Sequence, residues 1–222
     1  MCDGVNIKEV AQLGIDWIGL IFYPKSSRYV TMVPSMSGLI PDRATSTDCF
    51  QQSTNSQFKK VGVFVDDTPQ NIITRVVNYN LDIIQLHGDE TTTMIRNLRH
   101  TIDPDIHPGI QFIKAISVTT PEDIDRYKEY ENDVDYFLFD TKCETVGGSG
   151  KHFDWDVMQR YNGKKPFLLS GGIGPDDAEA VRKFCHPKCI GIDLNSKFEI
   201  SPAIKDVSAL KKFITKIKNQ TI

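Results

Sequence analysis

The sequence alternates short, almost continuously apolar runs with amphipathic stretches whose apolar residues recur at helical spacing. Apolar runs of this kind are typical of strands that are buried on both faces of a parallel sheet. Helical patterns cover residues 68–79, 176–184 and 207–217. Repeated strand–helix units with short connections predict an α/β fold built on a parallel sheet. The predicted strands are residues 17–22, 60–65, 82–86, 111–116, 136–139, 167–169 and 190–194.

Polar and glycine residues stand at the C-terminal ends of the last three predicted strands. Asp140 follows the first of these three, Ser170-Gly171-Gly172 follows the second, and Asp193, Asn195 and Ser196 close the third. In a parallel α/β barrel all such ends lie on one face, which is the face that carries active sites. Glycine-rich loops after the last two strands are also where such barrels bind phosphate.

The number of strands is informative, because a closed barrel of this type needs eight and we identify seven. A helical pattern at residues 6–13 leads straight into the first predicted strand. A strand–helix unit that begins with its helix lacks its strand. The prediction is therefore a single (β/α)8 TIM-barrel domain over residues 1–222 whose first strand is missing from the N-terminus. Within the polar stretch that follows residue 31, we expect a helix at 34–40 and a surface insertion at about 41–58.

Composition and charge exclude several classes of protein. The net charge is -3, so no basic surface predicts binding to nucleic acid or to an anionic membrane. No apolar run reaches the length of a membrane span, and no signal-peptide pattern is present. Five irregularly spaced cysteines predict reduced thiols and a cytoplasmic location. Cys185, His186 and Cys189 lack the second ligand pair that a zinc site needs, so no metal is expected.

Nine short motifs stand in order along nearly the whole chain. They include Tyr23-Pro24-Lys25-Ser26-Ser27-Arg28, Gln85-Leu86-His87-Gly88-Asp89-Glu90 and Phe139-Asp140-Thr141-Lys142. Each motif alone is weak, but the ordered set is specific, and it resembles the phosphoribosylanthranilate isomerase family of tryptophan biosynthesis. The matching segments are residues 13–16, 21–30, 61–64, 85–90, 139–142, 147–150, 153–155, 169–172 and 202–206.

The resemblance implies a (β/α)8 barrel that carries out an Amadori rearrangement, in which a phosphoribosyl amine of anthranilate opens and isomerises to a 1-deoxyribulose phosphate. This chemistry needs a general acid and a general base, and neither a metal nor an organic cofactor. The family's acid matches Asp140. Its base is a cysteine in a Lys-x-Cys-Gly motif at the end of the first strand, and this sequence lacks that motif.

Two explanations for the missing motif stay open at this point: a start assigned too far downstream, or a real loss of the strand. As given, the chain is expected to be impaired as an isomerase by loss of the general-base cysteine. The alternative is that Cys2 takes the place of the family's cysteine as the general base. Monomers and homodimers are both plausible in the family.

The resemblance also implies roles for residues that the sequence alone leaves ambiguous. Arg28 would contact the substrate carboxylate through its planar guanidinium, although without the resemblance a surface role is the simpler interpretation. His87 would either face the substrate or hydrogen-bond its own loop. Phosphate would be bound by Gly171, Gly172, Asp193, Asn195 and Ser196, and a loop containing Gly147, Gly148 and Gly150 would close over the substrate. Lys197 stands where the family usually has glycine.

Two other functions remain as alternatives. One is a non-catalytic phosphate-binding barrel, which is consistent with loss of the base. The other is a lyase that resembles indole-glycerol-phosphate synthase, a family that relies on lysines and glutamates at strand ends. Lys114 is the only clear lysine at such a position in this sequence.

Overall fold

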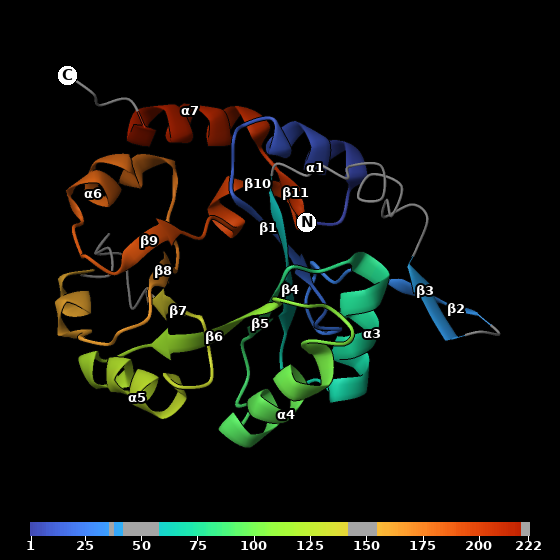
Figure 1. Ribbon diagram of the computed structural model, residues 1–222. Coiled ribbons are helices and arrows are strands. Elements are labelled where there is room, and N and C mark those ends of the chain that lie inside the picture. The colour runs from blue at the N-terminus through green and yellow to red at the C-terminus, as the bar shows by residue number, and fades with distance from the viewer. Residues whose placement is uncertain (36–37, 42–57, 142–154, 219–222) are drawn as a thin grey trace.

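The computed structural model describes residues 1–35, 38–41, 58–141 and 155–218. Its centre is a curled parallel sheet of seven strands, which Figure 1 shows as an incomplete ring with the helices outside. The prediction of seven parallel strands in chain order is confirmed. The strands, in sheet order, are β1 (Trp17–Ile21), β4 (Lys59–Phe64), β5 (Ile83–Leu86), β6 (Gln111–Val118), β7 (Tyr136–Thr141), β8 (Phe167–Ser170) and β9 (Cys189–Ile192).

Helices that connect the strands begin with local signals in the sequence. The Thr68 side chain accepts a hydrogen bond from the Asn71 N–H, and Pro69 occupies the first helical turn, so α3 has a complete N-cap. Thr91 caps α4 in the same way through the Met94 N–H. The helices are α1 (Gly4–Ala11), α3 (Pro69–Tyr79), α4 (Thr92–Ile102), α5 (Tyr127–Tyr130), α6 (Ala178–Lys183) and α7 (Val207–Lys218). Short 3-10 helices are η2 (Pro121–Arg126), η3 (Trp155–Arg160), η4 (Pro175–Asp177) and η5 (Ser196–Phe198).

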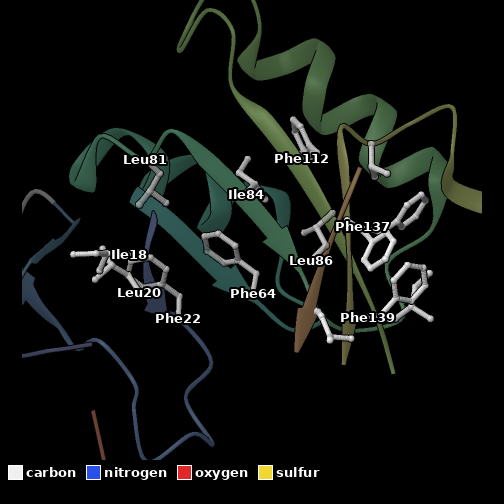
Figure 2. Packing of buried hydrophobic residues seen from close by; sticks show 14 of the residues in the cluster. Ile18, Leu20, Phe22, Phe64, Leu81, Ile84, Leu86, Phe112, Phe137 and Phe139 are labelled. Carbon is white, nitrogen blue, oxygen red and sulfur yellow. The ribbon is translucent and has the colours of Figure 1, made fainter. Parts of the chain in front are cut away.

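Alternation along the strands divides the core into two layers. Outward-facing side chains such as Phe64, Phe112, Phe137 and Phe139 are buried between the sheet and the helices (Figure 2). The residues between them face the inside of the ring, where the buried ones are Val61, Ile83, Ile113, Ala115 and Leu138. Because side chains alternate with a period of two, residue 140 shares the inner face with Leu138, and residue 85 shares it with Ile83.

The ring is open between its first and last strands. β1 and β9 stand at the two ends of the sheet and are not paired with each other within the described residues. A cavity of about 820 Å³ reaches between them, lined by both strands and by apolar residues of α1 and α7. The Met1 ammonium group donates a hydrogen bond of 2.8 Å to the Gly19 carbonyl on the free side of β1.

Two sequence-based boundaries need correction. The helix predicted at 34–40 is wrong, because β2 (Met32–Ser35) and β3 (Gly38–Pro41) form an antiparallel hairpin there. Pro34 has no N–H to donate and disfavours a helix interior, whereas an isolated two-stranded hairpin tolerates it. The helix predicted at 176–184 is split into η4 and α6. Residues 42–57 of the predicted insertion lie outside the described residues.

A second small hairpin is important for the site. β10 (Glu199–Ser201) and β11 (Ile204–Lys205) pair antiparallel after η5 and before α7. This hairpin follows β9 and therefore lies at the C-terminal end of the ring. Among the described helices, none is both long and apolar enough to cross a membrane.

Candidate functional site

Three strand ends place polar side chains at one end of the ring, as predicted. Asp140 on β7 lies in register with Ser170 on β8, and the Ser170 hydroxyl donates to the Asp193 carboxylate over 3.0 Å. All three residues line the cavity. Burial raises the pKa of Asp193, with the Ser170 hydrogen bond and Lys205 opposing this shift and Asp140 adding to it. The cavity end is therefore rich in groups that can hold or transfer a proton.

His87 completes this group from the neighbouring part of the sheet. It directly follows β5, and its Nε2 lies 3.4 Å from an Asp140 carboxylate oxygen. Its other ring nitrogen, Nδ1, is 3.5 Å from the Gln85 side-chain amide. Both His87 and Gln85 line the cavity. His87 thus lines the cavity and contacts Asp140, while its other ring nitrogen lies near Gln85.

The loop that carries His87 is held by a buried ion pair. The Lys114 ammonium lies 2.9 Å from the Glu90 carboxylate, and each side chain is 1% exposed. Lys114 also donates to the Gly88 carbonyl, and Glu90 accepts from the Gly88 and Asp66 N–H groups. Lys114 is not among the residues that line the cavity. Its full engagement beneath the loop removes it as a free lysine for lyase chemistry.

The Gly171-Gly172 pair forms a tight turn at the mouth of the cavity. Both residues have positive φ, +109° and +65°, a region that favours glycine. A Cβ on Gly171 would overlap the Thr141 carbonyl, while a Cβ on Gly172 would meet nothing within 4 Å. The Thr141 hydroxyl also donates to the Ser170 carbonyl over 2.7 Å, which fixes this turn against β7. Gly171 and Gly172 line the cavity together with Asn195 and Ser196.

Arg28 also lines the cavity and is already paired. Its Nε and Nη2 donate to both oxygens of Glu199 over 2.6–2.9 Å. Glu199 also contacts Lys205, whose ammonium reaches the backbone and side-chain oxygens of Asn195. Sequence reasoning missed Gln85, Glu199 and Lys205. The available signal was weak: Gln85 and Lys205 each lie within one of the matching segments, but no local pattern marks their partners.

Cys2 does not line the cavity. Its thiol donates to the Arg28 carbonyl over 3.2 Å, and burial raises its pKa. Of the cysteines that the structure describes, Cys2, Cys185 and Cys189, none lines the cavity. The three glycines at 147, 148 and 150, predicted to form a closing loop, lie outside the described residues.

Comparisons with known proteins agree on one family. The family model described as N-(5'phosphoribosyl)anthranilate (PRA) isomerase matches residues 7–216. The chain is 46% identical to the N-(5'-phosphoribosyl)anthranilate isomerase of Parabacteroides distasonis over 217 residues, which are 98% of this chain and 90% of the relative.

Two solved structures are also similar. The phosphoribosyl anthranilate isomerase of Thermotoga maritima has a TM-score of 0.77 and 27% identity, and the alignment covers 99% of this chain and 96% of that one. A phosphoribosyl anthranilate isomerase in complex with reduced 1-(o-carboxyphenylamino)-1-deoxyribulose 5-phosphate has a TM-score of 0.75 and 24% identity, over 99% and 96% of the two chains. The second similarity supports the fold alone.

Proposed function

The chain belongs to the N-(5'-phosphoribosyl)anthranilate isomerase family, and from this premise we propose that it acts in tryptophan biosynthesis. Its reaction is the Amadori rearrangement of N-(5-phosphoribosyl)anthranilate to 1-(2-carboxyphenylamino)-1-deoxyribulose 5-phosphate. The observation that supports this most directly is the grouping of His87, Asp140, Ser170 and Asp193 at one end of a cavity that Arg28 also lines.

Asp140 is the proposed general acid. It projects from an otherwise apolar strand into the cavity, and it would donate a proton to the furanose ring oxygen as the ring opens. The 3.4 Å contact with His87 Nε2 would hold the carboxyl group in one orientation and offer a route for its reprotonation. His87 is therefore proposed as a substrate-side residue.

The two charged ends of the substrate would bind at separated parts of the cavity. We assign the phosphate to backbone N–H groups of the Gly171-Gly172 turn and of the Asn195-Ser196 segment, with Asp193 shaping the loop between them. The carboxylate of anthranilate would contact Arg28. Because Arg28 is bound to Glu199, its Nη1 is the nitrogen most available to a ligand.

The second half of the reaction needs a base for the C2′ proton. The thiols of the described cysteines do not line the cavity, and that of Cys2 is directed to a backbone carbonyl. We therefore assign the base to none of the cysteines in the described part of the chain. A placed general base contributes about 10²–10⁴-fold to turnover.

The test separates binding from turnover. We expect the reduced product analogue to bind to the wild type and to Asp140→Asn by calorimetry, while Asp140→Asn lowers kcat about 10²–10⁴-fold. Gly172→Asp should abolish binding, because it puts a negative charge where phosphate would lie. Gly109→Asp is the matched control, since Gly109 also has positive φ and open space around its Cβ position. Unchanged binding in Gly172→Asp would remove the phosphate assignment.

The competing functions give different results in the same assay. Binding of the analogue without any turnover identifies a non-catalytic phosphate-binding barrel. The lyase alternative has little support, because Lys114 is held by Glu90 below the loop after β5. A cytoplasmic location and a monomeric or homodimeric state remain parts of this proposal, and the free thiols of Cys2, Cys185 and Cys189 are consistent with a reducing compartment.

A further inference from the structure

A series of polar side chains crosses from the loop after β1 to the loop after β9. It starts at Arg28, whose Nε and Nη2 form a forked pair with both carboxylate oxygens of Glu199. The Glu199 side chain is only 4% exposed. Burial by itself raises the pKa of Glu199, but Arg28 and Lys205 outweigh that effect and hold the pKa below its usual value. Glu199 is therefore a buried anion with two cationic partners.

Lys205 continues the series from Glu199 to Asn195. Its ammonium lies 3.2 Å from Glu199 Oε1, 3.0 Å from the Asn195 carbonyl and 2.9 Å from Asn195 Oδ1. The backbone of Lys205 is fixed as well, because Asn6 accepts from its N–H and donates to its carbonyl. Lys205 and Asn195 both line the cavity. The ammonium thus joins Glu199, which follows η5, to Asn195, which precedes it.

The charges of this series match a ligand with two negative ends. The two cations and the one carboxylate of this series sum to a net charge of +1. Removal of either partner from a buried, hydrogen-bonded ion pair leaves the other charge uncompensated, so the partners hold each other in one arrangement. A shift of Arg28 would therefore be felt at Lys205 and, through it, at Asn195.

We propose that Glu199 and Lys205 are positioning residues that couple the carboxylate-binding end of the cavity to its phosphate-binding end. This inference rests on the proposed function, which assigns Arg28 to the carboxylate and Asn195 to the phosphate. A ligand bound at one end of the cavity orders Glu199 and Lys205, and this favours binding of a ligand at the other end. The coupling is a free energy between two sites and is reciprocal.

The experiment measures this coupling with two fragments of the substrate, inorganic phosphate and anthranilate. The Kd of each is measured on the full chain, alone and with the other fragment at saturation. In the wild type we expect saturating phosphate to tighten anthranilate binding by about 5-fold or more. The coupling ratio is the Kd of anthranilate alone divided by its Kd at saturating phosphate. In Glu199→Gln and in Lys205→Met this ratio should fall to about one, because the link between Arg28 and Asn195 is broken. Circular dichroism and melting curves report whether each variant is folded.

A matched control distinguishes loss of the coupling from the effect of losing a partly buried ion pair elsewhere in the protein. Asp133→Asn removes the carboxylate partner of Arg96, a pair with a 2.8 Å contact and a carboxylate that is 9% exposed. The Arg96–Asp133 pair does not line the cavity, so the ratio should stay at the wild-type value. If Glu199→Gln fails to fold, Lys205→Arg keeps the charge but changes the donor geometry, and it should lower the ratio with melting close to that of the wild type.

The outcomes distinguish two kinds of failure. A wild type that binds both fragments with a ratio of one, or variants that keep the wild-type ratio, overturns the positioning role and leaves the proposed function intact. A wild type that binds neither fragment overturns the proposed function, and the positioning role with it.

Discussion

Gly171 and Gly172 are adjacent and both have positive φ, yet a side chain would have different consequences at each. We expect Gly172→Ala to cost about 1 kcal/mol of unfolding free energy, since only backbone strain opposes it. Gly171→Ala should cost about 3 kcal/mol or more, because its Cβ would also overlap the Thr141 carbonyl. Urea unfolding curves measure both costs. Equal costs would show that the contact with Thr141 relaxes freely.

The buried carboxyl of Asp193 predicts a specific pH dependence of stability. Burial raises its pKa, so the folded state holds this proton more tightly than the unfolded state. Its contribution to stability is complete below the unfolded-state pKa of about 3.9 and is lost as the pH rises through the folded-state pKa. We therefore expect Asp193→Asn to melt at a higher temperature than the wild type at neutral pH, and the difference to shrink towards about pH 4.

The control for this prediction is Asp176→Asn, which changes an exposed aspartate. Its effect on melting temperature should be small and should not follow the same pH trend. A destabilised Asp193→Asn at neutral pH would mean that the charged form of Asp193 is favoured in the fold, most simply through Lys205.

The loop after β5 depends on a single buried ion pair. Lys114→Met would leave Glu90 buried without its cation, and we expect a loss of about 3–5 kcal/mol in denaturant unfolding. Lys128→Met, which removes an exposed pair with Asp125, should leave the unfolding midpoint nearly unchanged. If Lys114→Met costs no more than this control, the pair does not hold the loop.

The positions of the strands are easier to predict from the sequence than the side-chain contacts of the site. Short, almost continuously apolar runs mark buried strands, and the predicted ends differ from the observed ones by at most two residues. The β2–β3 hairpin was missed because two four-residue segments give no usable periodicity. Arg28 and Glu199 are 171 residues apart, so no local pattern could reveal that the proposed carboxylate ligand is paired. The strand-end positions of Asp140 and Ser170 could be predicted, because an apolar run stops directly before each residue.

At the scale of the whole molecule, the opening between β1 and β9 leaves two strand edges without partners in the described residues. Unpaired edges favour association with other chains. We expect fusion of a parallel strand ending in Lys-x-Cys-Gly ahead of Met1 to reduce aggregation and to raise the melting temperature. In a chain of this length each 1 kcal/mol corresponds to about 2–4 °C.

The same fusion tests the base. Turnover should rise by about 10²–10⁴-fold, since a thiol would then stand at the end of a strand beside the cavity. A fusion with serine in place of that cysteine should keep the gain in melting temperature without the gain in turnover. A fusion that changes neither property would indicate that the opening does not accept an eighth strand.

The open ring also has a mechanical consequence. Within the seven-stranded sheet, neighbouring strands are joined by backbone hydrogen bonds. The segments next to the two end strands are instead linked through side chains, notably Arg28 with Glu199 and Asn6 with Lys205. A force applied between Trp17 and Ile190 in an optical trap would therefore break side-chain contacts before it breaks the backbone hydrogen bonds between strands. The ring should extend in a first step at low force, between its first and last strands, and only then unfold.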